Sequence, residues 1–255
     1  MKRYAVLSRA VLVIAVNGCA HVDANMRGST SEPRSSLTAI LLDRSGSRSQ
    51  LEINQDRQLL SEVINGLGFG ERLLIEEVHR EGRKDGAPRW MTEMPVPNDS
   101  TVLTAVDNES LRRARSAAVV AVAAVFDSSR PNRTDLMATL FDVGELARQT
   151  PSPYWRVLML SDMLQSTHDV NMEAPDGIPN AGWISEEKRQ GFIPDLAGAC
   201  VVVVGADRST DHGKRVFTFW RQYFQAAGTD LSTSNYQYLA FHGVALRCSK
   251  VLAQS

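Results

Sequence analysis

The stretch Leu37 to Ser47 reads L-T-A-I-L-L-D-R-S-G-S, an apolar run that stops at Asp43 and is followed by hydroxyl side chains at Ser45 and Ser47. A continuous apolar run of this length, bounded by turn residues, is typical of a strand buried on both faces of a parallel sheet. Carboxylate and hydroxyl oxygens suit a hard divalent cation. The stretch therefore predicts a central strand that carries a metal-binding loop at one edge of a sheet.

Downstream of this stretch, short apolar runs alternate with segments whose apolar residues recur at helical spacing. The alternation predicts an α/β fold, a Rossmann-like, doubly wound and mainly parallel sheet flanked by helices on both faces. The strands are expected at 37–42, 72–78, 156–160, 200–204 and 238–241, and the helices at 59–67, 117–126 and 214–228. Residues 79–100 are expected to form mainly a long loop or hairpin, with a short edge strand at 90–96 as the alternative.

Two segments stand out within that pattern. Residues 117–126 are apolar nearly all round but too short for a bilayer, which takes about 20 residues, so we expect a central helix buried nearly all round. Residues 163–194 form a long connection that leaves the same sheet edge as the predicted metal loop. An exposed Trp183 and Ile184 in this connection are candidate partner contacts, since loops on a rigid scaffold often carry specificity. The alternative is that Trp183 packs the insertion onto the body.

Residues 1–18 have the layout of an export signal, with basic residues before the apolar run 10–16. A small residue directly before Cys19 resembles the lipobox of bacterial lipoproteins. The resemblance implies that Cys19 is lipidated and that the exported chain is held at the bacterial envelope by this lipid anchor alone. The absence of aspartate at Ala20 implies, by the same resemblance, the outer membrane. We expect the periplasmic face in preference to the surface, and the sequence leaves the surface open as the alternative. An ordinary cleaved signal and a buried first strand are the alternatives.

The remaining chain divides into a polar tether, residues 19–36, and one domain, residues 37–255. Removing residues 1–18 takes away three of the 28 Lys and Arg residues and none of the 29 Asp and Glu residues, which leaves a net charge of −4. A chain of that charge is a poor match for nucleic acid. Export would allow Cys200 and Cys248 to form a disulfide, and two buried free thiols are the alternative.

Three separate places contribute oxygen ligands to the same edge of the predicted sheet. D-R-S-G-S carries Asp43, Ser45 and Ser47 after the first strand, R-T-D-L carries Thr134, and L-M-L-S-D carries Asp162 at the end of a later strand. Their order and spacing resemble the metal-ion-dependent adhesion site of von Willebrand factor A (VWA) domains, over essentially residues 37–245. The resemblance implies a bacterial VWA-domain lipoprotein.

The resemblance also implies a role for each residue. Ser45, Ser47 and Thr134 would bind the ion directly, and Asp43 and Asp162 would bind it or hold its waters. Mg²⁺, or Mn²⁺ in its place, prefers oxygen ligands and gives up water reluctantly, so hydroxyls with water-bridged carboxylates leave its charge unquenched. An acidic residue of a protein partner would then complete the coordination.

Two neighbours of these motifs bear on the site. Met163 follows the second aspartate where many VWA domains have glycine, so we expect the loop to run differently and Asp162 to lie further from the ion. Arg44 lies inside the first motif, and we expect its side chain to point away from the ligands and to attract an acidic partner.

The expected function is thus cation-dependent protein–protein interaction at the cell envelope, and not catalysis. A Mg²⁺-dependent phosphohydrolase with Asp43 as nucleophile is the main alternative, but such enzymes usually carry a second carboxylate two residues on, where this chain has Ser45. A metal-free, structural VWA-like domain is the other alternative.

Overall fold

The computed structural model describes residues 36–45, 48–78, 89–99, 101–126, 134–150, 152 and 154–238, all within one compact unit, Ser31–Ser255. The strands of these residues are β1 (Ser36–Leu42), β2 (Arg72–Glu77), β3 (Arg89–Glu93), β4 (Tyr154–Leu160), β5 (Ala199–Val204) and β6 (Tyr236–Gln237). They form one sheet in the order β3-β2-β1-β4-β5-β6, in which all neighbours are parallel except the antiparallel edge strand β3.

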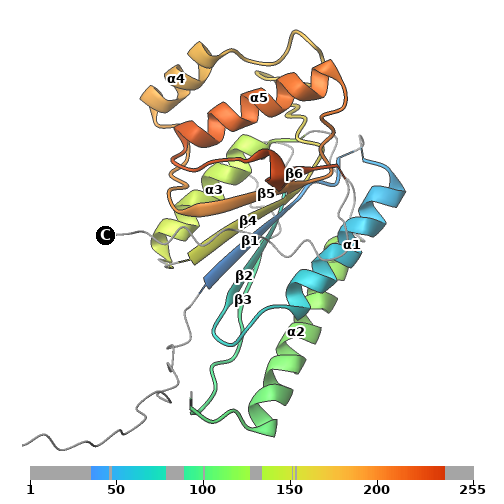
Figure 1. The fold of residues 1–255 in the computed structure, drawn as a ribbon, viewed down its shortest axis with the longest axis vertical. Helices are drawn as coiled ribbons and strands as arrows, with labels where there is room; N and C mark the ends of the chain where they lie inside the picture. The colour runs from blue at the N-terminus through green and yellow to red at the C-terminus, as the bar shows by residue number, and fades with distance from the viewer. Residues whose placement is uncertain are drawn as a thin grey trace, which may run out of the picture. The chain divides into compact units, whose positions relative to one another are not determined.

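Helices of the described chain cover both faces of this sheet (Figure 1). They are α1 (Gln50–Asn65), α2 (Ala105–Phe126), α3 (Leu136–Gln149), α4 (Ala181–Gln190) and α5 (Asp211–Ala226), with a short 3₁₀ turn η1 (Thr233–Asn235) before β6. The first two helices lie on one face, and α3 and α5 lie on the other, with α4 packed against α5. The predicted α/β, doubly wound architecture is confirmed.

The central strand β1 is buried along its whole length. Successive side chains of a strand point to opposite faces of the sheet. Leu37, Ala39 and Leu41 accordingly enter the apolar core beneath α3 and α5, while Ile40 and Leu42 enter the core beneath α1 and α2. Since helices cover both faces of the sheet, β1 needs a continuous apolar run.

Local capping fixes where the helices begin next to the sheet edge. The Ser49 side chain accepts a hydrogen bond from the backbone of Glu52, and the Glu52 carboxylate accepts one from the Ser49 backbone N–H, which makes a capping box at the start of α1. Asp135 caps α3 and Thr210 caps α5 in the same way, through their side-chain oxygens. These caps hold the loops after β1 and β5 close to the sheet.

The helix α2 corrects one expectation. It begins at Ala105, twelve residues before the predicted start at 117, and it is not buried nearly all round. Its contact face is narrow, and Val120 on the opposite side is 70% exposed. The physical reason is its position, since α2 packs beside α1 on a single face of the sheet and has no layer outside it. No helix among the described residues is both long and apolar enough to cross a membrane.

The boundaries of the other elements differ less from the predicted ones. The predicted strand at 72–78 is confirmed as β2, and within 79–100 the structure has the alternative, a short edge strand, as β3. The connection 163–194 contains a complete helix, α4, whose buried Ile184 was wrongly expected to be exposed. The last described strand, β6, lies just before the strand expected at 238–241, and residues 239–241 lie outside the described part of the chain.

Candidate functional site

The order of the strands singles out one position on the sheet. The parallel strands β1 and β4 are neighbours at its centre, and the chain goes from β1 towards β2 but from β4 towards β5, in opposite directions. Doubly wound sheets bind ligands in the crevice at such a switch point, outside the carboxyl ends of the strands. Asp43 directly follows β1 and Asp162 follows β4 by one residue, so both predicted carboxylates lie at this point.

The Asp43 carboxylate is held in place from two sides. It is 1% exposed, and its two oxygens accept hydrogen bonds from the Ser45 backbone N–H (2.9 Å) and from the Ser161 hydroxyl (2.6 Å). Its own backbone N–H donates to the carbonyl of Leu160 (3.0 Å). The first motif is therefore joined directly to the end of β4, as the metal-site hypothesis requires.

Thr134 reaches the same region through a short antiparallel bridge with Ser166. The Thr134 N–H donates to the Ser166 carbonyl (3.2 Å) and the Ser166 N–H donates to the Thr134 carbonyl (2.8 Å). The Gln165 side chain adds a further link, because its amide nitrogen donates to Asp135 (2.9 Å) and its oxygen accepts from the N–H of Leu136 (2.7 Å). Within the described residues, the buried Thr134 hydroxyl makes no hydrogen bond.

Asp162 is half-buried and accepts a hydrogen bond from the Leu164 N–H (3.0 Å). The next residue, Met163, has φ of 65°, the left-handed region that favours glycine, and among the described non-glycine residues it is alone in this. Its N–H donates to the Ser161 hydroxyl (2.9 Å) and its carbonyl accepts from the Trp220 indole (2.8 Å). Met163 therefore has a backbone conformation that favours glycine, and the expected difference in loop path stays a prediction.

Two buried arginines flank Asp43. Arg44 is 2% exposed, and its Nε donates to the Glu77 carboxylate at the end of β2 (2.8 Å). Arg48 is also buried and pairs with Asp56 on α1 (2.7 Å). The expectation that Arg44 contacts a partner is therefore wrong, because the loop after β1 turns its side chain inwards, where burial requires a carboxylate beside it.

The charges at this edge do not cancel. Each arginine offsets the carboxylate that it pairs with, whereas the Asp43 carboxylate accepts its hydrogen bonds from uncharged donors. Its negative charge is one that a cation at this edge would neutralise. Hydroxyl and carboxylate oxygens with this residual charge fit Mg²⁺ or Mn²⁺.

A third strand also contributes to the edge. Gly205, just after β5, has φ of 108°, and a Cβ atom there would lie 2.9 Å from the Arg48 guanidinium and 3.0 Å from the carbonyl oxygen of Ser161. The close approach needs a glycine. The end of β5 therefore packs directly against Arg48, on the side of Asp43 away from Arg44.

The sequence-based prediction missed the residues that support Asp43. Asp56 carried a usable signal, because Ile53, Asp56, Leu60 and Ile64 share one helical face and the face is otherwise apolar. An acidic residue in such a stripe needs a buried partner, which is Arg48. No comparable pattern marks Ser161, whose hydroxyl is recognised only from the pairing of β1 with β4.

The buried Asp56 leads to a pH-dependent prediction. Burial raises the pKa of its carboxyl from 3.8 to about 6, against the lowering effect of Arg48. The stability that the protonated carboxyl contributes is full below about pH 4 and is lost as the pH rises through about 6, because the unfolded chain releases its proton first. Relative to Asp56→Asn, the free energy of unfolding of the wild type is expected to fall by about 2 kcal/mol from pH 4 to pH 7. Urea titrations across this range measure it, and parallel curves for the two proteins would contradict it.

Several predicted residues cannot be placed in this site. Ser47, Cys19 and Cys248 lie outside the described residues, as do residues 1–35, so the signal, the lipid anchor and most of the tether stay predictions. Cys200 on β5 is disulfide-bonded, and its pairing with Cys248 likewise stays a prediction. Trp183 is half-buried on α4, with its ring 6.1 Å from that of Phe219 on α5, so it packs the insertion onto the body.

Comparisons with known proteins concern the fold. No protein-family model matches the chain, and no curated protein matches it. Among solved structures, the open conformation of the pilus adhesin SpaC from Lactobacillus rhamnosus GG is 10% identical, with a TM-score of 0.46, over 80% of this chain and 27% of that one.

Two further structures are also similar at low identity. A variant of the PilB minor pilin from Streptococcus sanguinis is 10% identical, with a TM-score of 0.46, over 81% of this chain and 57% of its own. A von Willebrand factor type A protein from Catenulispora acidiphila is 13% identical, with a TM-score of 0.38, over 76% and 43%. The chain thus spans less than two thirds of each of the three proteins.

Proposed function

We propose that this chain is a lipid-anchored, VWA-like module of the bacterial envelope that binds a divalent cation and, through it, a protein partner. The observation that carries the proposal is that the loops after β1 and β4 are joined at the switch point and that the loop of Thr134 is bridged to the second of them. The Asp43 carboxylate is fixed by Ser161 at the end of β4, and the Thr134 hydroxyl, in a loop bridged to Ser166, makes no hydrogen bond within the described residues.

The cation would be held by Ser45 and Thr134, with Asp43 and Asp162 binding it directly or through water. Ser47 completes this set in the sequence and lies outside the described residues. The bound cation supplies a positive charge that two hydroxyls leave largely uncompensated, and an Asp or Glu of a protein partner would bind to it. The partner is thus defined by an exposed acidic residue.

The envelope part of the proposal rests on Cys19 and the segment before it. Lipidation of Cys19 would hold the domain by its tether at the periplasmic face of the outer membrane, where protein partners of the envelope are within reach. Mass spectrometry of the mature protein tests this, since an N-terminal residue other than a lipid-modified Cys19 would contradict the anchor.

Binding is favoured over catalysis by the environment of Asp43. A phosphohydrolase of the alternative class needs this carboxylate as an open nucleophile, but it is almost fully buried and both of its oxygens accept hydrogen bonds. Such a carboxylate is placed to orient a ligand and not to attack a substrate. We therefore propose that the site has no hydrolytic activity.

The test is calorimetric titration of Mg²⁺ and Mn²⁺ into the protein and into Thr134→Ala. Thr134 is the best position to change, because Asp43 also joins β1 to β4 and its replacement threatens folding. The wild type is expected to bind one cation, and Thr134→Ala is expected to bind it at least about tenfold more weakly, since one hydrogen-bonding or coordinating group is worth more than about 1.4 kcal/mol beside a charge.

The matched control is Thr218→Ala on α5, where the hydroxyl donates to the carbonyl of Lys214 (2.8 Å). It removes a threonine hydroxyl without touching the site, so its cation affinity is expected to equal that of the wild type. A folded wild type that gives no binding heat and no cation-dependent change in melting temperature would refute the metal site. Hydrolysis of p-nitrophenyl phosphate in the same samples would instead support the hydrolase.

A further inference from the structure

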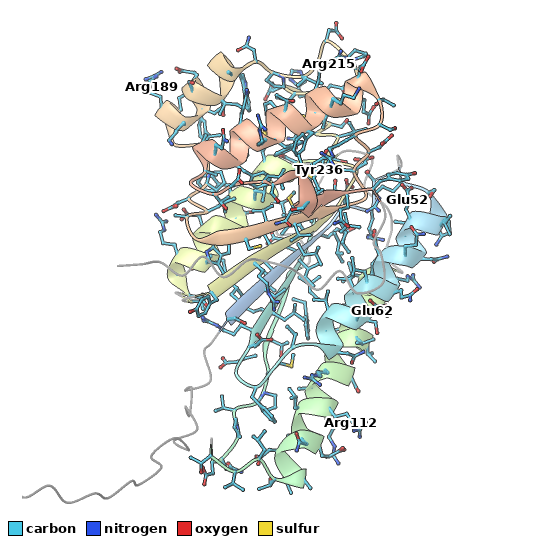
Figure 2. The ribbon with its side chains drawn as sticks, viewed as in Figure 1. Glu52, Glu62, Arg112, Arg189, Arg215 and Tyr236 are labelled. Atoms are coloured by element: carbon cyan, nitrogen blue, oxygen red, sulfur yellow. The ribbon has the colours of Figure 1, made fainter. Side chains whose placement is uncertain are left out.

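A pocket opens at the same edge of the sheet, beyond the switch point. It has a volume of about 810 Å³, within the usual range of small-ligand sites of about 300–1,000 Å³. It lies at the carboxyl ends of β5 and β6 and below the start of α5; Figure 2 shows Tyr236 at this place. Its lining is basic, hydroxylic and aromatic, from Ala206, Arg208, Ser209, Lys214, Phe217, Thr233, Ser234, Tyr236, Gln237 and Tyr238.

The Arg208 side chain is the main cation of this pocket. Its guanidinium lies over the ring of Phe217, 5.0 Å from the centroid, and 6.0 Å from the centroid of Tyr236. The two rings pack edge to face, 4.9 Å apart. Within the described residues Arg208 makes these ring contacts and no ion pair or hydrogen bond, so its donors face the pocket or solvent. Such a planar fork matches a carboxylate.

The loop that carries Arg208 is fixed by its neighbours. The Asp207 carboxylate accepts hydrogen bonds from the Ser209 N–H (2.7 Å) and hydroxyl (2.8 Å). The loop also packs tightly on the first turn of α5, because a Cβ atom at Gly213 would lie 2.1 Å from the Asp207 carbonyl oxygen. Arg208 is thus held in position before any ligand arrives, which lowers the entropy lost on binding.

Two buried polar atoms of the lining have no hydrogen-bond partner within the described residues. The Tyr236 hydroxyl is one, on a side chain that is 1% exposed. The other is the side-chain oxygen of Gln237, whose amide nitrogen donates to the Ser234 carbonyl (2.7 Å). Buried groups without partners are rare in native proteins. Two of them at one pocket indicate that a ligand supplies hydrogen bonds there, including an N–H donor for the Gln237 oxygen.

The charges around the pocket favour a single carboxylate over a phosphate group. Lys214, the second cation of the lining, already pairs with Asp211 (2.8 Å). Burial is the largest cause of the raised pKa of the Tyr236 phenol, and the nearby charge of Asp162 raises this pKa further. One unpaired guanidinium beside these carboxylates balances one negative charge, and a dianionic phosphate would be repelled.

We propose that this pocket binds an acidic peptide segment, with a Glu or Asp carboxylate on Arg208, a neighbouring apolar side chain on the aromatic lining and a backbone N–H on Gln237. A peptide carries all three groups, whereas a free organic acid lacks the N–H donor. This binding needs no metal and goes beyond the function proposed above, so either one can fail without the other.

The probe is N-acetyl-glutamyl-phenylalaninamide, titrated into the full-length, ¹⁵N-labelled protein in EDTA and followed by NMR. Saturable shifts are expected for residues 206–214 and 233–238. The glutaminyl analogue and phenyl phosphate are each expected to bind at least about tenfold more weakly, because the charge-assisted hydrogen bonds to Arg208 are lost or opposed.

Variants assign the effect to one side chain. Arg208→Gln is expected to weaken binding by at least about tenfold, and Arg208→Lys, which keeps the charge and the fold but not the fork, by a smaller factor. Arg215→Gln, on the outer side of α5 (Figure 2), is the matched control and is expected to bind like the wild type. Absence of saturable shifts, equal binding of the glutaminyl analogue or unchanged binding by Arg208→Gln would each overturn the proposal, and tighter binding of phenyl phosphate would do the same.

Discussion

Arg44→Met is expected to lower the free energy of unfolding by about 3–5 kcal/mol, the usual cost of removing one partner from a buried ion pair. The variant leaves the Glu77 carboxylate buried without its cation, and burial already raises the pKa of that carboxyl. It also removes the donor to the carbonyl of Phe126 (3.4 Å) at the end of α2. Urea denaturation followed by circular dichroism measures the loss.

Two further variants test whether the loss of stability is specific to this ion pair. Arg44→Met combined with Glu77→Leu is expected to recover most of the lost stability, because an apolar pair of similar volume often replaces a buried ion pair without net cost. Arg148→Met breaks an exposed pair with Glu145 on α3 and is expected to change stability little. A single-variant loss below about 1 kcal/mol, or a double variant less stable than Arg44→Met, would show that the pair does not hold this edge.

Trp220→Ala is the second large effect, with an expected loss of about 3–5 kcal/mol. Trp220 is fully buried on α5, its ring centroid is 5.2 Å from that of Tyr223, and its indole N–H donates to the Met163 carbonyl (2.8 Å). The substitution leaves a cavity in the core beneath α3 and α5, and it frees the turn that follows Asp162. Chemical unfolding measures the loss of stability.

The contribution of the hydrogen bond can be separated from that of the cavity. Trp220→Phe keeps most of the apolar contact but leaves the Met163 carbonyl without its donor, so an intermediate loss of about 1–3 kcal/mol is expected. Phe192→Ala, at a position that is 51% exposed, controls for the removal of an aromatic ring and is expected to have little effect. If Trp220→Ala were as stable as Phe192→Ala, the assigned role of this core would be wrong.

The strands were predictable because both faces of the sheet are covered. An apolar run that is buried on both sides is visible in the sequence without knowledge of its neighbours, which is why β1, β2, β4 and β5 lie close to their predicted positions. The strand ends then indicated where Asp43 and Asp162 would be, since parallel strands share their carboxyl edge. The extent of α2 was not predictable in this way, because its first half is polar and its outer face is solvated.

The surroundings of the candidate site were harder to predict than its position. Beyond the end of a strand the side chains no longer alternate between faces, so the inward direction of Arg44 could not be read from its place in the motif. Its partner Glu77 comes from a different strand, and Arg48 meets Asp56 across a turn and a helix. Such pairs depend on tertiary contacts that are distant along the chain, and local sequence patterns do not record them.

The left-handed turn at Met163 determines how firmly Asp162 is held at the sheet edge. A glycine could adopt this turn without steric cost, whereas Met163 is kept in it by its burial and by the hydrogen bond from the Trp220 indole to its carbonyl. The position of Asp162 is therefore maintained by the packing of α5, and the loop belongs to the same cooperative unit as the core. Local fluctuations that separate the loop from the sheet would have to break this packing, so the carboxyl edge of the sheet at Asp162 is as ordered as the core beneath α5.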